Sequence, residues 1–311
     1  MTTLLYSHAS CIEHNPGEFH PESPDRLRAV MSGLDNEEFE HLEHLEAPII
    51  DVDSIKRVHQ SEYVERILDN VPQEGEVHVR LDPDTAMSSA SGEAARRAAG
   101  AIVNAVDQIV DGKAKNAFCA VRPPGHHAES SRAMGFCLFN SAAIGAFYAR
   151  AKYGMERVAV IDFDVHHGNG TQHSFEMDPG LFYGSSHQFP AYPGTGSSDE
   201  TGVDGNVVNV PLPPGAGSAE FRAAYNDSIL PKLRRFDPEV LIISAGFDAH
   251  VDDPLAQLQV QTIDYSWVTE ELLKAADECC DGHVISLLEG GYNLSALTAS
   301  SQAHVRALMA A

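Results

Sequence analysis

The sequence alternates short runs of β-branched and aliphatic residues with longer segments of helical periodicity. The short runs predict strands at residues 3–6, 117–121, 158–162, 181–184, 207–210, 240–244 and 283–288. The longer segments predict helices at residues 26–34, 61–68, 92–110, 141–153, 219–235, 263–280 and 296–309. Such alternation is typical of a parallel sheet with helices on both faces. We therefore expect one α/β domain over residues 1–311, a length that single domains of this class reach.

Composition excludes several classes of protein. The formal net charge of −24 argues against nucleic-acid binding, which needs a basic face. This acidity either attracts cationic substrates or only keeps the surface soluble, and its even spread favours solubility. We expect neither a membrane span nor a secretory signal, because no apolar run is long enough for a span and the first residues lack the regions of a signal. Five cysteines without a CxxC pair indicate reduced thiols in a cytoplasmic protein.

Residues with chemical potential follow four of the predicted strands. The segments beyond these strands contain His126 and His127, then Asp162, Asp164, His166 and Asn169, then Asp248, and finally Tyr292. Open α/β sheets bind their ligands beyond the carboxyl ends of the strands, and parallel strands end at one edge. The sequence therefore predicts that these side chains form one site.

A metal site is indicated by Asp164 and His166. Residues two apart in an extended segment project to the same side, and Asp248 supplies a third ligand from another strand end. Three protein ligands with one open position are typical of a catalytic metal. The mixed oxygen and nitrogen set suits zinc, and it also admits iron(II) or cobalt. An isolated Asp-x-His pair more often caps a helix, but the neighbouring motifs favour the metal.

Four residues are candidates for proton transfer, charge stabilisation or the orientation of a histidine. His126 and His127 follow a rigid Pro-Pro-Gly turn, and they are predicted to supply a general base and its partner. Tyr292 follows two glycines and suits donation to an oxyanion, although a surface turn tyrosine fits equally well. Asp162 either orients a histidine or is a buried strand-end carboxylate, and these two interpretations are compatible.

Eight motifs together resemble the histone deacetylase family, in particular its class II branch and the bacterial deacetylase-like amidohydrolases. They are HPESPDR at 20–26, RPPGHH at 122–127, GFCLFN at 135–140, DFDVHHGNGTQ at 162–172, YPGTG at 192–196, SAGFDAH at 244–250, DPLA at 253–256 and LEGGYNL at 288–294. The resemblance covers nearly the whole chain. It implies an arginase-like, three-layer α/β fold around an eight-stranded, mostly parallel sheet.

The resemblance also implies the ions of the site. Zinc would bind to Asp164, His166 and Asp248. A structural potassium ion would lie near Asp162, Asp164, His166, Ser185 and Ser186. Arg26 would lie near an internal exit path for acetate.

The same resemblance assigns catalytic roles. His127 would act as general base and acid, and His126, oriented by Asp162, would assist electrostatically. Tyr292 would polarise the substrate carbonyl. Asn169 would be the neutral orienting partner of His127, where class I enzymes have an aspartate.

A channel for the acylated side chain is implied as well. Phe136 and Tyr192 would flank it, and Gly135 would offer a backbone carbonyl to the substrate. Tyr192 replaces the more usual phenylalanine and adds a hydroxyl near the mouth. Leu255 and Asp84 would lie at the rim, although Asp84 also fits a helix-capping turn.

The predicted function is zinc-dependent hydrolysis of the acetyl amide of lysine side chains or lysine-like amines. The substrate would be an acetylated lysine peptide or protein, or an acetylated small amine. Assembly as a homo-oligomer is left open. Two alternatives are an acetylpolyamine amidohydrolase and a catalytically silent binder of acyl-lysine. A ureohydrolase would need an aspartate two residues after the ligand histidine, where this chain has Gly168.

Overall fold

A computed structural model describes residues 2–311, and its centre is one eight-stranded sheet of order β2-β1-β5-β10-β9-β6-β7-β8. Every neighbouring pair of strands in this sheet is parallel. The strands are β1 (Thr3–Ser7), β2 (Glu43–Glu46), β5 (Asn116–Cys119), β6 (Val158–Asp162), β7 (Leu181–Gln188), β8 (Val207–Leu212), β9 (Val240–Ala245) and β10 (Val284–Leu288). The expected sheet is thereby confirmed.

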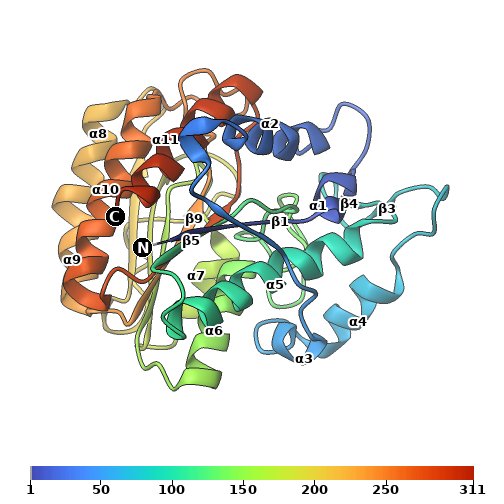
Figure 1. Cartoon of the computed structure of the whole chain (residues 1–311), viewed down its shortest axis with the longest axis horizontal. Coiled ribbons are helices and arrows are strands. Elements are labelled where there is room, and N and C mark those ends of the chain that lie inside the picture. The colour runs from blue at the N-terminus through green and yellow to red at the C-terminus, as the bar shows by residue number, and fades with distance from the viewer. Residues whose placement is uncertain (1) are drawn as a thin grey trace.

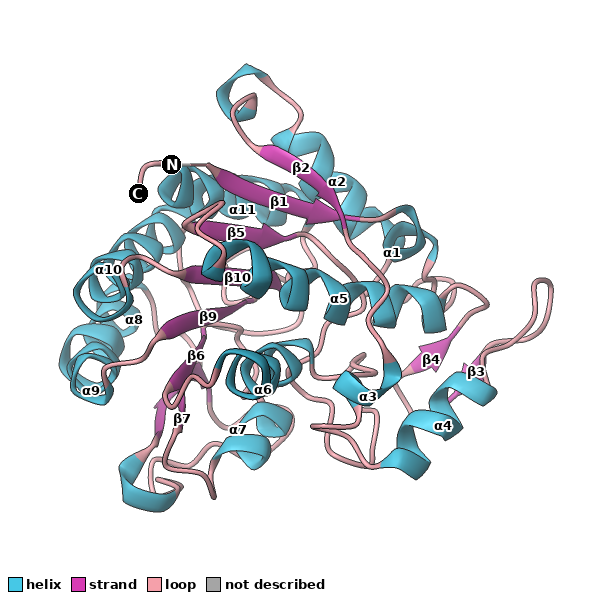
Figure 2. Ribbon diagram, turned by 60° about the horizontal axis from the view of Figure 1, so that its bottom comes forward, coloured by secondary structure: helices cyan, strands magenta, loops and turns pink. Residues whose placement is uncertain are grey.

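Helices cover both faces of the sheet (Figures 1 and 2). On one face lie α2 (Pro24–Leu34), α8 (Ser218–Ala223), α9 (Leu230–Phe236), α10 (Thr262–Cys280) and α11 (Leu294–Met309). On the other lie α5 (Ser91–Val110), α6 (Ser141–Tyr153) and α7 (Asn169–Phe175). The remaining α-helices are α1 (Ala9–Glu13), α3 (Val52–Ile55) and α4 (Ser61–Asp69). This arrangement is the three-layer α/β fold that the sequence predicts.

The predicted strands and helices are all present, with shifts of a few residues at their ends. Helix α6 has the predicted bounds because Asn140 caps its first turn and Gly154, with φ of 70°, ends it. The helix predicted at 219–235 is interrupted by a π-helical segment, Ala224–Ile229, between α8 and α9. The prediction of a single domain stays a prediction.

Strand β2 is the one strand of the sheet that the sequence did not indicate. Its residues, Glu43–Glu46, are mostly exposed, and it pairs only with β1 at the edge of the sheet. An exposed edge strand needs no apolar run, so its sequence lacks the usual signal. By contrast, β6 and β9 are buried along their whole length, as their apolar sequences predict.

Strands β5, β10, β9 and β6 are consecutive in the parallel sheet. Their carboxyl ends therefore lie at the same edge. A two-stranded antiparallel sheet of β3 (Val79–Arg80) and β4 (Ala86–Met87) adds a small hairpin, whose turn contains Asp84. Among residues 2–311, no helix combines the length and apolarity needed to cross a membrane.

Candidate active site

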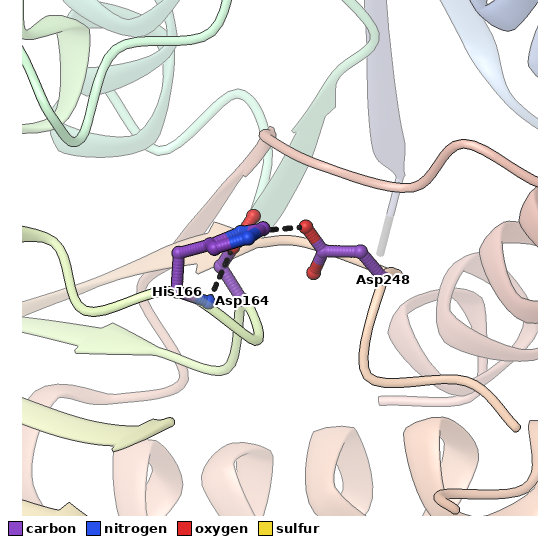
Figure 3. Close-up of side chains that lie close together, drawn as sticks. All are labelled: Asp164, His166 and Asp248. Atoms are coloured by element: carbon purple, nitrogen blue, oxygen red, sulfur yellow. Dashed lines mark hydrogen bonds and ion pairs between the residues drawn. The ribbon is translucent and has the colours of Figure 1, made fainter. Parts of the chain in front are cut away.

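Three predicted metal ligands converge beyond the ends of β6 and β9 (Figure 3). One ligand atom from each of Asp164, His166 and Asp248 lies within 4.8 Å of the other two. The Nδ1 atom of His166 lies 3.1 Å from Asp164 Oδ1 and 3.2 Å from Asp248 Oδ2. Asp164 and His166 follow β6, and Asp248 follows the neighbouring strand β9, so the pairing of these strands brings the three ligands together.

The chemistry of this cluster fits a divalent cation. The Oδ2 atom of Asp248 is buried and has no hydrogen-bond partner among the described residues. A β-carbon added to Gly246 or Gly290 would collide with the carboxylates of Asp164 and Asp248, so the glycines leave room for the ligands. Burial and the charge of Asp164 together raise the pKa of Asp248 to about 7. A divalent cation would offset the charge of the two carboxylates more fully than His166 does, and the donor set suits zinc.

The turn that presents the two histidines is fastened to the protein interior. Arg122, before the turn, is fully buried, and its Nε donates to the carboxylate of Glu22 at 2.5 Å. Glu289, at the end of β10, accepts hydrogen bonds from the backbone of Gly125 at 2.7 Å and of His126 at 3.2 Å. These contacts fix the histidine pair against the same sheet edge that positions the metal ligands.

The two histidines have different partners and different protonation. Asp162 lies 2.9 Å from His126 Nδ1, and the Oδ1 of Asn169 lies 2.8 Å from His127 Nδ1. Burial lowers the pKa of His126, but the charges of Asp162 and Asp164 outweigh it and raise the pKa well above its ordinary value. Burial and the neighbouring His126 hold the pKa of His127 well below its ordinary value. His127 is therefore neutral and able to accept a proton, beside a cationic His126.

Tyr292 is held at the end of β10 by backbone contacts. Its N–H donates to Asp253 Oδ2 at 2.7 Å, and the preceding Gly291 has φ of 120°. The buried Arg26 donates to the Gly291 carbonyl at 2.6 Å, and its guanidinium carbon lies 4.9 Å from the centre of the tyrosine ring. Burial raises the pKa of Tyr292 well above its ordinary value, although Arg26 opposes this. The phenol thus remains protonated, as a hydrogen-bond donor must.

Three of the predicted channel residues lie beside His127 and Tyr292. The rings of Phe136 and Tyr292 lie 5.9 Å apart, and those of Tyr192 and His127 lie 5.1 Å apart, both edge to face. Gly135 has φ of 55°, and a β-carbon there would collide with the His127 ring. The structure therefore brings both predicted aromatic walls and the glycine to the histidine and tyrosine.

The two rim residues lie on loops that reach this site. Asp84 is half-buried, and the hydroxyl of the next residue, Thr85, accepts from the backbone N–H of Phe136 at 3.0 Å. Leu255 is exposed on the loop whose Asp253 holds the Tyr292 backbone. Their roles toward a substrate stay predictions.

The residues predicted for potassium lie on neighbouring strands. Asp162 of β6 is paired in register with Ser185 of β7. The Ser185 hydroxyl lies 2.9 Å from His187 Nδ1, and the Ser186 hydroxyl lies 3.2 Å from the hydroxyl of Tyr225. Potassium binding there stays a prediction.

Comparison with known proteins agrees with this arrangement. Residues 20–308 match the histone deacetylase domain family. The chain belongs to the histone deacetylase family. It is 37% identical over 324 residues to histone deacetylase 14, chloroplastic, of Arabidopsis thaliana, covering 98% of this chain and 76% of that protein. It is 35% identical over 300 residues to a probable deacetylase of Archaeoglobus fulgidus, covering 94% and 82%.

The fold comparison gives the same family. A crystal structure of the HDA15 HD domain matches this chain with a TM-score of 0.93 and 38% identity, covering 100% of this chain and 89% of that one. Sequence and structure thus place the chain among histone deacetylase-family hydrolases, and membership implies deacetylation as the general activity.

Proposed function

We propose that this histone deacetylase-family protein is a zinc-dependent enzyme that hydrolyses the acetyl amide of lysine side chains and releases acetate. The observation that carries the proposal is the metal-ligand cluster beside the His127 ring, whose centre lies 6.0 Å from that of His166. The lowered pKa of His127 and the raised pKa of Tyr292 support the roles of base and donor. The chemistry fits zinc, and iron(II) or cobalt are alternatives for the same donors. The rings of Phe136 and Tyr192, beside Tyr292 and His127, support a substrate with an apolar stem.

The mechanism assigns one task to each residue. Zinc held by Asp164, His166 and Asp248 would polarise the amide carbonyl and make a water more acidic. His127 accepts the proton of the attacking water through Nε2 and then donates it to the departing amine. Tyr292 donates to the carbonyl oxygen as negative charge develops on it.

Activity of the purified wild type tests this proposal. Zinc-loaded protein is expected to release acetate from an acetyl-lysine peptide, with loss of activity after chelation. Binding of the peptide without acetate release would instead support a silent acyl-lysine binder. Full activity after exhaustive removal of metal would contradict the zinc mechanism.

Replacing Tyr292 by phenylalanine tests the oxyanion donor. Removal of one such donor typically lowers turnover about 100-fold or more. We expect kcat to fall by about this factor while KM changes little, because the ring and its contact with Arg26 remain. Steady-state kinetics on an acetyl-lysine peptide measure this. A variant within about threefold of wild type would contradict the role.

Substrate preference is proposed to depend on Leu255. An exposed apolar residue at the rim packs against a lysine stem and offers nothing to a distant ammonium group. We therefore propose acetylated lysine peptides or proteins as substrates, with acetylated polyamines as the alternative that the acidic surface favours.

Leu255→Glu is expected to shift the preference toward acetylspermidine by about threefold to tenfold, because it adds a charge at the mouth. The measurement is the ratio of kcat/KM for acetylspermidine and an acetyl-lysine peptide, with Leu255→Gln as the uncharged control. A wild-type ratio that already favours the polyamine would replace the lysine assignment by the polyamine one.

The setting of the protein is also a proposal. All five cysteines are free thiols, which supports a reducing compartment such as the cytoplasm. The charge of −24 supports substrates and partners other than nucleic acid. We propose structural potassium beside Asp162, Asp164, His166, Ser185 and Ser186, as the resemblance implies.

A further inference from the structure

The orienting partner of His127 is itself held by a carboxylate. Asn169 presents Oδ1 to His127 Nδ1 at 2.8 Å, and its Nδ2 donates to the side chain of Glu129. A carboxylate only accepts hydrogen bonds, whereas the two ends of an asparagine amide are nearly the same in shape. Glu129 therefore selects the orientation of Asn169 in which the amide oxygen faces the histidine.

This orientation determines the tautomer of His127. The Oδ1 of Asn169 is an acceptor, so the hydrogen of the neutral ring must lie on Nδ1. The Nε2 lone pair is then free for the proton of the attacking water. The reversed amide would present a donor to Nδ1 and place the hydrogen on Nε2, where the ring is no longer a base.

We propose that Glu129 is a positioning residue that sets the tautomer of His127 through the amide of Asn169. The kinetic part of this inference rests on the proposed hydrolytic function, whereas the tautomer of His127 can be measured without turnover. Asn169 is a neutral partner whose amide can face either way, so the acceptors around its Nδ2 set the tautomer. The His127 backbone carbonyl lies 3.4 Å from this Nδ2, whereas the Glu129 carboxylate makes the shorter, charge-assisted hydrogen bond and so contributes most of the orientation.

The surroundings of Glu129 keep its carboxylate in place and ionised. Its backbone carbonyl accepts from His59 Nδ1 at 2.9 Å, and its N–H donates to the Arg132 carbonyl at 2.9 Å. The Nδ1 of His173, on α7, lies 2.9 Å from both carboxylate oxygens. Burial raises the pKa of Glu129, but the hydrogen bonds from His173 and Asn169 outweigh it and lower the pKa.

His173 lies on the solvent side of Glu129. The side chain of Glu129 is 18% exposed, and that of His173 is 44% exposed. The hydrogen bond between His173 and Glu129 raises the pKa of His173, and the charges of Glu176 and Glu200 raise it as well. The charged groups that face Glu129 are thus His173 on α7 and Arg132 in its own loop.

The test is a cycle of two substitutions, Glu129→Gln and Asn169→Asp. Glutamine both donates and accepts, so Glu129→Gln leaves only the longer contact with the His127 carbonyl to orient Asn169. We expect kcat to fall about tenfold with KM nearly unchanged. In the Asn169→Asp background the acidic side chain at 169 accepts from His127 directly, but it repels Glu129. There Glu129→Gln is expected to raise kcat by about threefold or more, since the glutamine amide donates to the new carboxylate.

A second measurement reports the tautomer directly and needs no turnover. The ¹⁵N chemical shifts of the His127 ring, assigned by their loss in His127→Ala, are expected to show hydrogen on Nδ1 in the wild type. A mixture of tautomers is expected in Glu129→Gln. Glu176→Gln is the matched control, because it removes a carboxylate that faces His173 without contacting Asn169.

Two results would overturn the proposal. One is an unchanged tautomer in Glu129→Gln. The other is an equal loss of kcat from Glu129→Gln in both backgrounds, which would show a merely structural role. If the wild type has no hydrolytic activity, the proposed function fails, and the tautomer comparison still decides the role of Glu129.

Discussion

Replacing Asp248 by alanine is expected to abolish hydrolysis of acetyl-lysine peptides while the chain still folds. The substitution removes one of three ligands, and the remaining Asp164 and His166 provide too few donors for a firmly held catalytic ion. Loss of the several kcal/mol that a catalytic metal contributes corresponds to about a thousandfold or more in turnover.

Folding should survive this change because Asp248 has few favourable contacts of its own. Its Oδ1 accepts one hydrogen bond, from the Val165 N–H at 2.8 Å. Its Oδ2 has no hydrogen-bond partner among the described residues and lies 3.2 Å from Nδ1 of His166, which Asp164 also contacts. Its carboxylate is also costly in the metal-free fold, since burial and Asp164 raise its pKa to about 7.

Zinc content tests the loss of the metal site, and thermal unfolding tests whether Asp248→Ala still folds. Zinc should raise the Tm of the wild type and leave that of Asp248→Ala unchanged, because a ligand stabilises only the state that binds it. Asp264→Asn is a control: this buried carboxylate pairs with Arg222, so its loss should lower stability without lowering zinc content. An Asp248→Ala variant that keeps a tenth of the wild-type kcat/KM would contradict the metal assignment.

The sequence was informative about the sheet wherever burial restricts residue choice. The runs at β6 and β9 are apolar because both faces of these strands are covered, and their positions follow from the sequence alone. Strand β2 pairs at an exposed edge, where Glu43 and His44 are tolerated. The π-helical segment between α8 and α9 spans six residues, which is too short for hydrophobic periodicity to distinguish it from the α-helices on either side.

The sequence predicted the site residues that lie close to other site residues along the chain. Asp164 and His166 are two apart, and His126 follows a rigid turn, so local spacing indicated them. Glu129 and Glu289 act through long-range contacts with Asn169 and with the backbone at Gly125. Such contacts exist only after the sheet brings distant segments together. The sequence around a single glutamate does not reveal such contacts. The available signals were position alone: Glu289 directly follows an apolar strand, and Glu129 follows the histidine motif.

The strongest test of the proton-transfer role is His127→Ala, for which we expect a loss of kcat of about a thousandfold. General acid–base catalysis typically contributes a factor of about 100 to 10,000, and this residue is assigned both the water proton and the amine proton. The loss should exceed that of Tyr292→Phe, because the phenol shares stabilisation of the oxyanion with the metal. KM should change little, since Phe136 and Tyr192 still line the passage.

Chemical rescue separates loss of the base from loss of the fold. Alanine leaves space where the His127 ring packs against Gly135, beside the free oxygen of Asn169. Added imidazole can occupy this space and donate to that oxygen, so it should restore part of the activity of His127→Ala. The matched control is His283→Ala, at the opposite edge of the sheet before β10, which should keep wild-type kcat and gain nothing from imidazole. Turnover of His127→Ala within about tenfold of wild type would contradict the assignment, because proton transfer contributes at least about 100-fold.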